Sequence, residues 1–144
     1  MSDTFLVGVD GSEGSMRAAQ FAVDRAKRMN TRLVVAYVIE WSPYSFNTPE
    51  ENEQRHQRRE QEISTAKEKV LDPLLEGIKA QSVETVGIVR HGHIAEVMIG
   101  VAKEYNALGM FVGRLGTTTL KTMLFGSVTS NLVQSSPIPV TVVP

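Results

Sequence analysis

The residues with the clearest chemical potential lie near the C-terminus, in residues 112–129, VGRLGTTTLKTMLFGSVT. Gly113 and Gly116 suit a tight turn, because glycine tolerates positive φ and lacks the side chain that would keep a phosphate away from backbone amides. Glycines also end strands in many α/β proteins that bind no nucleotide, so the glycines alone are weak evidence. The stretch nevertheless predicts a phosphate-binding loop.

The end of this stretch adds a second feature. Gly126, Ser127, Val128 and Thr129 begin a segment that is predicted to be a helix over 127–136. The first amides of a helix have no intrahelical acceptor, and its positive dipole end attracts anions. The Ser127 and Thr129 hydroxyls are expected to add hydrogen-bond donors.

Regular elements must hold this loop, and the chain alternates apolar runs with helical patterns. Strands are predicted at 5–9, 32–40, 83–92, 107–113 and 137–144, with a loop at 41–54. Helices are predicted from a Ser12 or Ser15 cap to about 29, from about 50 to 80 with an adjustment near Pro73, and over 94–106. The order predicts a single α/β domain, residues 1–144: a doubly wound, five-stranded parallel sheet with helices on both faces.

Two loops compete for the crevice beyond the carboxyl ends of such strands. One follows the first strand and contains Asp10, Gly11 and Ser12; the other spans residues 113–127. We expect a ligand to lie between them.

Composition excludes several classes of protein. The net charge of −1 and the absence of a basic cluster argue against a nucleic-acid partner. No apolar run approaches about 18 residues, so membrane insertion is not expected. Without a visible signal segment or any cysteine, a cytoplasmic location is expected.

The spacing Gly113-x2-Gly116-x9-Gly126-Ser127 matches the G-2x-G-9x-G-[S/T] signature of ATP-binding universal stress proteins. The chain also resembles this UspA family at 5–26, 32–40, 92–102 and 137–143. The resemblance implies a Rossmann-like fold of the adenine nucleotide alpha hydrolase type, and binding of ATP with Mg²⁺ or Mn²⁺.

The resemblance also implies roles for individual residues. Val9 and Asp10 match positions that contact adenine and ribose, and Val38 matches a position beside adenine. Val112, Gly113, Leu115 and Gly116 fall where the loop wraps the nucleotide, and the phosphates are expected at Gly126, Ser127, Val128 and Thr129. Asp10 either helps to place the metal ion or accepts amide hydrogen bonds within its own turn.

Other residues leave alternatives open. Arg114 and Leu115 replace the small serine and the basic residue or histidine that family members commonly carry; Arg114 either contacts phosphate or points to solvent. His91 and His93 are poor evidence for a metal site, and His93 caps the next helix or lines the edge of the pocket. Trp41, Tyr44 and Phe46 close over the pocket or pack on the surface.

The resemblance implies a homodimer, in which strands 138–143 of two subunits pair antiparallel and cover an apolar edge. It also implies a nucleotide-dependent regulator of the stress response with an unknown protein partner. No Walker A lysine or other catalytic motif is present, so we expect binding with at most slow ATP hydrolysis. The alternatives are a nucleotide-free member acting as a homodimeric interaction module, and a flavin electron carrier.

Overall fold

The computed structural model describes residues 3–40, 48–115 and 125–144. In chain order the elements are β1 (Thr4–Val9), α1 (Glu13–Met29), β2 (Arg32–Glu40), α2 (Pro49–Ala66), the π-helical turn η1 (Lys67–Leu71), α3 (Asp72–Ala80), β3 (Thr85–Gly92), α4 (Ile94–Glu104), β4 (Gly109–Gly113), α5 (Ser127–Ser135) and β5 (Val140–Val143). The predicted strands and helices are thus confirmed, with small shifts at their ends.

The strands form one parallel sheet in the order β3-β2-β1-β4-β5. The chain first moves from β1 outward through β2 to β3, and then returns past β1 to add β4 and β5 on the other side. This reversal of direction between β1 and β4 separates the loops that leave their carboxyl ends, which creates a crevice there. The predicted doubly wound α/β fold is confirmed.

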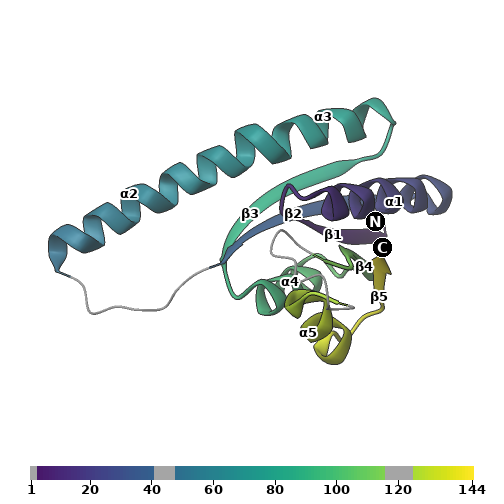
Figure 1. Cartoon of the computed structure of the whole chain (residues 1–144). Coiled ribbons are helices and arrows are strands. Elements are labelled where there is room, and N and C mark those ends of the chain that lie inside the picture. The colour runs from purple at the N-terminus through teal and green to yellow at the C-terminus, as the bar shows by residue number, and fades with distance from the viewer. Residues whose placement is uncertain (1–2, 41–47, 116–124) are drawn as a thin grey trace.

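The helices cover both faces of the sheet. Figure 1 shows α1 and α3 on one face, with α4 and α5 on the other. Strand β2 illustrates why: Leu33 and Val35 join the core beneath α1, while Val34 and Ala36 join the core beneath α4. All four are fully buried, as expected for a parallel strand covered on both sides.

Helix α2 begins at Pro49, which confirms the predicted start at about 50; the overlapping prediction of a loop as far as 54 is wrong, because residues 49–54 are helical. The Thr48 hydroxyl accepts from the Glu51 amide at 3.2 Å, and the Glu51 carboxylate accepts from the Thr48 amide at 3.3 Å. Pro49 follows this capping box at the first helical position, where a fixed φ favours the helix. Proline therefore starts the helix here instead of breaking it. Residues 41–47, with Trp41, Tyr44 and Phe46, lie outside the described residues.

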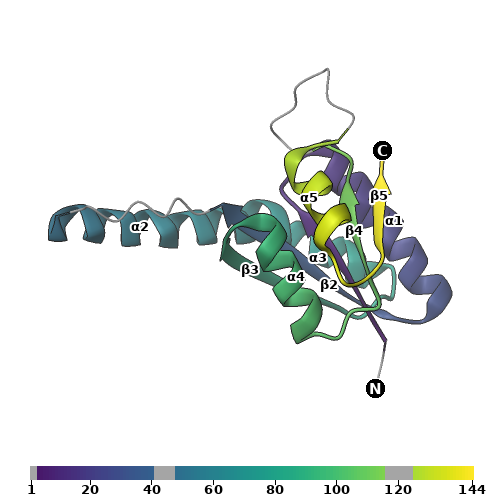
Figure 2. The same ribbon diagram turned by 90° about the horizontal axis from the view of Figure 1, so that it is seen from below.

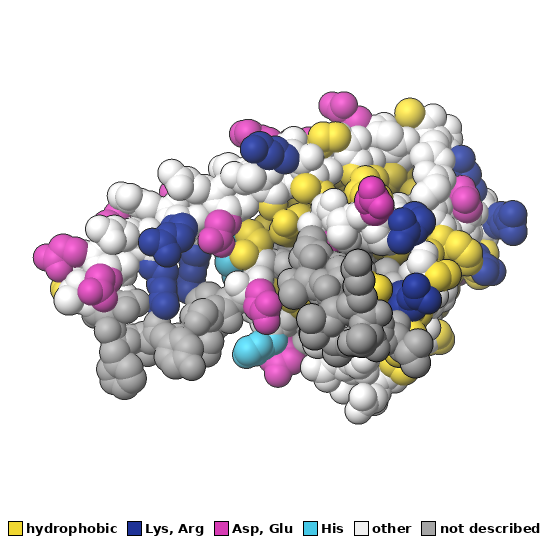
Figure 3. All heavy atoms as spheres, in the orientation of Figure 1, with side chains coloured by type: hydrophobic (Ala, Val, Ile, Leu, Met, Phe, Trp, Pro, Cys, Tyr) yellow, Lys and Arg dark blue, Asp and Glu magenta, His cyan; other side chains and the backbone are white. Residues whose placement is uncertain are grey.

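Helix α2 extends beyond the sheet (Figures 1 and 2). Within the described chain, Ala66 is its one buried residue, and charged side chains are spread along its length (Figure 3). In the part of the chain that the structure describes, no helix has the length and apolarity needed to cross a bilayer.

The predicted adjustment near Pro73 is confirmed by η1, which immediately precedes α3. Proline lacks a backbone donor, and a π-turn is one way in which a helix accommodates a break in its hydrogen-bond ladder. The turn places Val70 against the loop that follows β1. A Cβ on Gly11 would lie 3.3 Å from a Val70 methyl, and the Gly11 φ of +83° is itself unfavourable for other residues.

Leu132 anchors α5 to the sheet and gives a direct test of this packing. It is 0% exposed, whereas the next residue, Val133, is 56% exposed. We expect Leu132→Ala to lower the free energy of unfolding by about 2–5 kcal/mol, because it leaves a cavity in the core. The matched control, Val133→Ala, should change it by about 0.5 kcal/mol or less. Urea denaturation followed by circular dichroism measures both, and equal effects would contradict the packing described.

Candidate functional site

A cavity of about 180 Å³ opens at the carboxyl ends of β1, β2 and β4, in the crevice created by the reversal of strand order. Every described residue of the predicted site lines it: Val9, Asp10, Val38, Val112, Gly113, Leu115, Gly126, Ser127, Val128 and Thr129. Gly116 lies outside the described residues. The fold therefore brings together two loops that are more than 100 residues apart in the chain.

The cavity is also lined by residues that were not predicted from the sequence. Ala36 and Glu40 line it from β2, on the same face as Val38, because side chains alternate along a strand. Ile94 and Met98 line it from α4, one helical turn apart. The two-residue spacing on β2 can be recognised in the sequence once Val38 is assigned to the cavity, and the four-residue spacing on α4 is that of one helix face.

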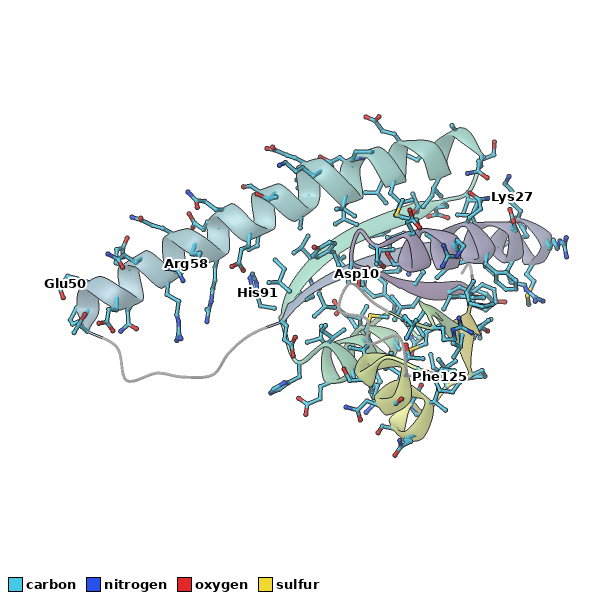
Figure 4. All side chains as sticks on the ribbon, in the orientation of Figure 1. Asp10, Lys27, Glu50, Arg58, His91 and Phe125 are labelled. Atoms are coloured by element: carbon cyan, nitrogen blue, oxygen red, sulfur yellow. The ribbon has the colours of Figure 1, made fainter. Side chains whose placement is uncertain are left out.

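Asp10 sits at the end of β1, beside the start of α1 (Figure 4). The Ser12 amide donates to its Oδ1 at 2.9 Å, and the Ser12 hydroxyl donates to the same oxygen. The Ser15 hydroxyl accepts from the Asp10 amide at 3.2 Å. Asp10 thus accepts hydrogen bonds within its own turn, which was one of the two predicted roles. Among the described residues, no three His, Cys, Asp or Glu side chains are grouped to hold a metal ion.

Tyr37 neighbours this end of β1, since its Cα is paired with that of Val9. Burial raises the pKa of the Tyr37 phenol above its ordinary value of 10.0, and the Asp10 carboxylate raises it further. Both causes favour the protonated phenol, so Tyr37 is neutral at physiological pH. It packs on the α1 side of the sheet, away from the cavity.

The first turn of α5 lines the cavity and has no side-chain cap. Gly126 is its N-cap and provides no side-chain hydrogen bond, and the first backbone bond of this turn runs from the Ser130 amide to the Gly126 carbonyl at 3.0 Å. The amides of Ser127, Val128 and Thr129 therefore have no intrahelical acceptor. No acidic residue occupies this turn.

The N-terminus of α1 is satisfied by its own residues. The Ser12 hydroxyl accepts from the Ser15 amide at 3.2 Å, and Glu13 provides a negative charge in the first turn. A third helix N-terminus, that of α4, also lines the cavity through Ile94; it has no side-chain cap, but Glu96 lies in its first turn. Of the three, α5 is the one whose first turn has neither a side-chain cap nor an acidic residue, which favours an anion.

The Thr129 hydroxyl does not have its predicted role. It donates to the Gly113 carbonyl at 2.7 Å, and Thr129 is only 3% exposed. The hydroxyl therefore fastens α5 to the end of β4, and the prediction that it donates to a phosphate is corrected. The Ser127 hydroxyl is exposed at the cavity.

Gly113 is needed for a reason other than the predicted turn, since its φ is not positive. A Cβ there would lie 3.0 Å from the backbone carbon of Gly14, and a Cβ on Gly14 would lie 3.0 Å from the Leu115 carbonyl oxygen. These distances are too short for ordinary packing. The paired glycines let the chain after β4 cross the first turn of α1, and Gly14 was not predicted.

Arg114, His91 and His93 are the basic residues near this end of the sheet for which roles were considered. Arg114 is exposed and does not line the cavity, which agrees with the solvent-facing alternative. His93 stands at the N-cap of α4, but its side chain makes no capping hydrogen bond and does not line the cavity. His91 lies 3.9 Å from the Glu62 carboxylate of α2. His93 is thus at the predicted cap position, where its backbone carbonyl accepts from the Val97 amide at 2.9 Å, and the alternative role at the edge of the cavity is not supported.

Comparisons with known proteins agree over the full chain. The model of the Universal stress protein family matches residues 1–144. The chain is 29% identical to the universal stress protein YxiE of Bacillus subtilis (strain 168), over 99% of each protein. The structure of the universal stress protein UspA from Lactobacillus plantarum superposes with a TM-score of 0.89 at 23% identity, covering 99% of this chain and 98% of that one.

Two further structures were solved with nucleotides. A universal stress protein in complex with cAMP has a TM-score of 0.64 and 24% identity, covering 99% of this chain and 96% of that one. The universal stress protein from Archaeoglobus fulgidus in complex with dAMP has a TM-score of 0.67 and 17% identity, covering 99% and 98%. At these identities both share the fold of this chain.

The hydrogen bond from Thr129 to Gly113 can be tested with two variants. Thr129→Val keeps the shape but leaves the Gly113 carbonyl without this donor, which should cost about 1–3 kcal/mol of unfolding free energy. Thr129→Ser keeps the hydroxyl and loses one methyl group, so it should cost less than the valine variant. Chemical denaturation measures both; a larger loss for serine would show that the methyl group dominates.

Proposed function

The chain belongs to the universal stress protein family, and we propose that it binds ATP, with Mg²⁺, in the cavity at the ends of β1, β2 and β4. The observation that carries this proposal is the first turn of α5, which has no side-chain cap and whose first three residues, including an exposed serine, line the cavity. Such a turn is suited to phosphate oxygens. The relatives solved with cAMP and dAMP support an adenine nucleotide as the ligand class.

The rest of the cavity suits a nucleoside attached to those phosphates. Apolar side chains of Val38, Ile94 and Met98 offer a surface for a flat base. Val9 and Asp10 lie at the end of the central strand β1, between β2 and β4, where a ribose would reach them. The order from β2 to α5 is therefore base, sugar, phosphate.

Asp10 could provide the protein carboxylate that a magnesium ion bound to nucleotide phosphates requires. Mg²⁺ in such sites takes one or two protein carboxylates, and the remaining ligands are phosphate oxygens and waters. One Asp10 oxygen is fixed by Ser12, which orients the carboxyl group at the edge of the cavity. When bound, the ion neutralises phosphate charge.

Ser127 offers the sharpest test of the phosphate end. We expect Ser127→Asp to weaken ATP-Mg binding at least about tenfold, because it adds a negative charge beside the α5 amides. The same charge favours the helix dipole, so the melting temperature should not fall. Ser127→Asn, a neutral variant of the same shape, should remain within about threefold of the parent affinity.

The measurement is calorimetric titration of ATP-Mg, preceded by acid extraction of the freshly purified protein and chromatography of any released nucleotide. Copurified adenine nucleotide and a selective loss in Ser127→Asp would support the proposal. No nucleotide and no binding heat would refute it and favour the alternative of a nucleotide-free interaction module.

We further propose that the molecule works as a homodimer in the cytoplasm, with β5 of two subunits pairing antiparallel. Strand β5 is at one edge of the sheet. The carbonyls of Pro139 and Val143 accept bonds from the β4 side, from Met110 and Arg114. Because backbone groups alternate in direction along a strand, those of Val140 and Val142 face the open edge.

A proline at position 142 should therefore separate the subunits. Val142→Pro removes an outward N–H without breaking a bond to β4, and edge strands tolerate proline. Val142→Ala loses a similar apolar contact but keeps the N–H, so it should remain dimeric. Light scattering after size-exclusion chromatography measures the mass; a dimer for both variants would place the interface elsewhere.

As a regulator, the protein would bind an unidentified protein partner with different affinities in its empty and ATP-bound forms. Such a difference requires the partner to distinguish the two forms, so pull-down with and without saturating ATP-Mg is the test. Equal capture in both conditions would refute the coupling.

A further inference from the structure

Glu40 is the last residue of β2 and lines the mouth of the cavity. It follows Ala36 and Val38 on the same face of the strand, two residues beyond the position expected beside the base. Its side chain is exposed, so it reaches the rim of the cavity without disturbing the core.

The carboxylate of Glu40 is available to a ligand. Among the described residues it makes no hydrogen bond and no ion pair, in contrast to Asp10, whose Oδ1 accepts from Ser12. Within the described lining, Asp10 and Glu40 are the charged side chains, and both are acidic. A carboxylate accepts hydrogen bonds and cannot donate them when ionised.

The position of β2 in the strand order indicates which part of a bound nucleotide would lie nearest to Glu40. The phosphate end is set by α5, which follows β4, and β2 lies two strands away in the order β2-β1-β4. At about 4.8 Å per strand, Glu40 is about 10 Å across the sheet from the end of β4. The base, not the phosphate, therefore lies nearest to Glu40.

Resting on the proposed nucleotide site, we propose that Glu40 determines base specificity by accepting a hydrogen bond from the 6-amino group of adenine. Hypoxanthine and guanine carry a carbonyl at that position, and a carboxylate cannot donate to it. Two acceptors facing one another are repelled, so nucleotides with a 6-carbonyl are disfavoured. In an adenine nucleotide, the ribose hydroxyls are the other hydrogen-bond donors that the nucleoside offers to a carboxylate.

The experiment compares ATP, ITP and 2′-deoxyATP, each with Mg²⁺, by calorimetric titration into the parent protein, Glu40→Gln and Glu84→Gln. ITP lacks the 6-amino group, and 2′-deoxyATP lacks a ribose hydroxyl. Glu84→Gln is the matched control, because it makes the same charge change at an exposed residue. Glu84 precedes β3, so it lies at the amino end of that strand, away from the carboxyl ends where the cavity opens. Affinity ratios are compared, because removing a negative charge raises the affinity for all three anions together.

We expect the parent protein to prefer ATP to ITP by about tenfold, as a hydrogen bond to a charged group allows. In Glu40→Gln this preference should fall to about threefold or less, since a glutamine amide can donate to the 6-carbonyl as well as accept from the 6-amino group. The ratio of ATP to 2′-deoxyATP should stay unchanged, and Glu84→Gln should keep both parent ratios.

An unchanged ATP-to-ITP ratio in Glu40→Gln would overturn the assignment. A changed ATP-to-2′-deoxyATP ratio would also overturn it, because the carboxylate would then face the sugar. If Glu84→Gln changed the affinity ratios as much as Glu40→Gln does, the effect would be due to net charge alone, and the assignment would be overturned. Absence of any nucleotide binding by the parent protein is a separate result, which refutes the proposed function itself.

Discussion

The architecture depends on one constraint, which is that β1 must be buried on both faces and paired along both edges. Leu6 and Val7 are essentially inaccessible to solvent and point to opposite cores. Helix α1 carries the chain from β1 toward β2, so β4 has to enter on the other side. The loops at the carboxyl ends of β1 and β4 consequently diverge, and the cavity is the space that they leave.

The chemistry of the cavity depends on how differently α1 and α5 begin. Helix α1 satisfies its own first turn with Ser12 and Glu13, whereas α5 begins at a glycine and has no side-chain cap. A ligand thus meets positive potential on one side and the acidic groups of Asp10 and Glu40 on the other. In the proposed nucleotide complex, this polarity would orient the anionic ligand before any detailed contact is formed.

The sheet and most of the cavity were predictable because they follow local rules. Continuous apolar runs marked the strands, and the Gly113-to-Ser127 spacing marked the loop. The predictions that failed depended on contacts with residues far away in the sequence. The Thr129 hydroxyl bonds a carbonyl 16 residues away, and Gly14 is constrained by residues of β4 and beyond. The loop before α2 was predicted to extend too far for a local reason, since Pro49 was interpreted as an interruption, whereas the capping box of Thr48 and Glu51 makes it the first residue of the helix.

The crossing of Gly14 with Gly113 and Leu115 has a mechanical consequence. Side chains absorb small displacements by changing rotamers, but this contact joins backbone to backbone and has no such compliance. A shift of the chain after β4 toward α1 therefore meets the backbone of the first turn of α1 directly. That turn holds Ser15, whose hydroxyl accepts from the Asp10 amide. The two loops at this end of the cavity are therefore already close together, and there is little room for them to approach further.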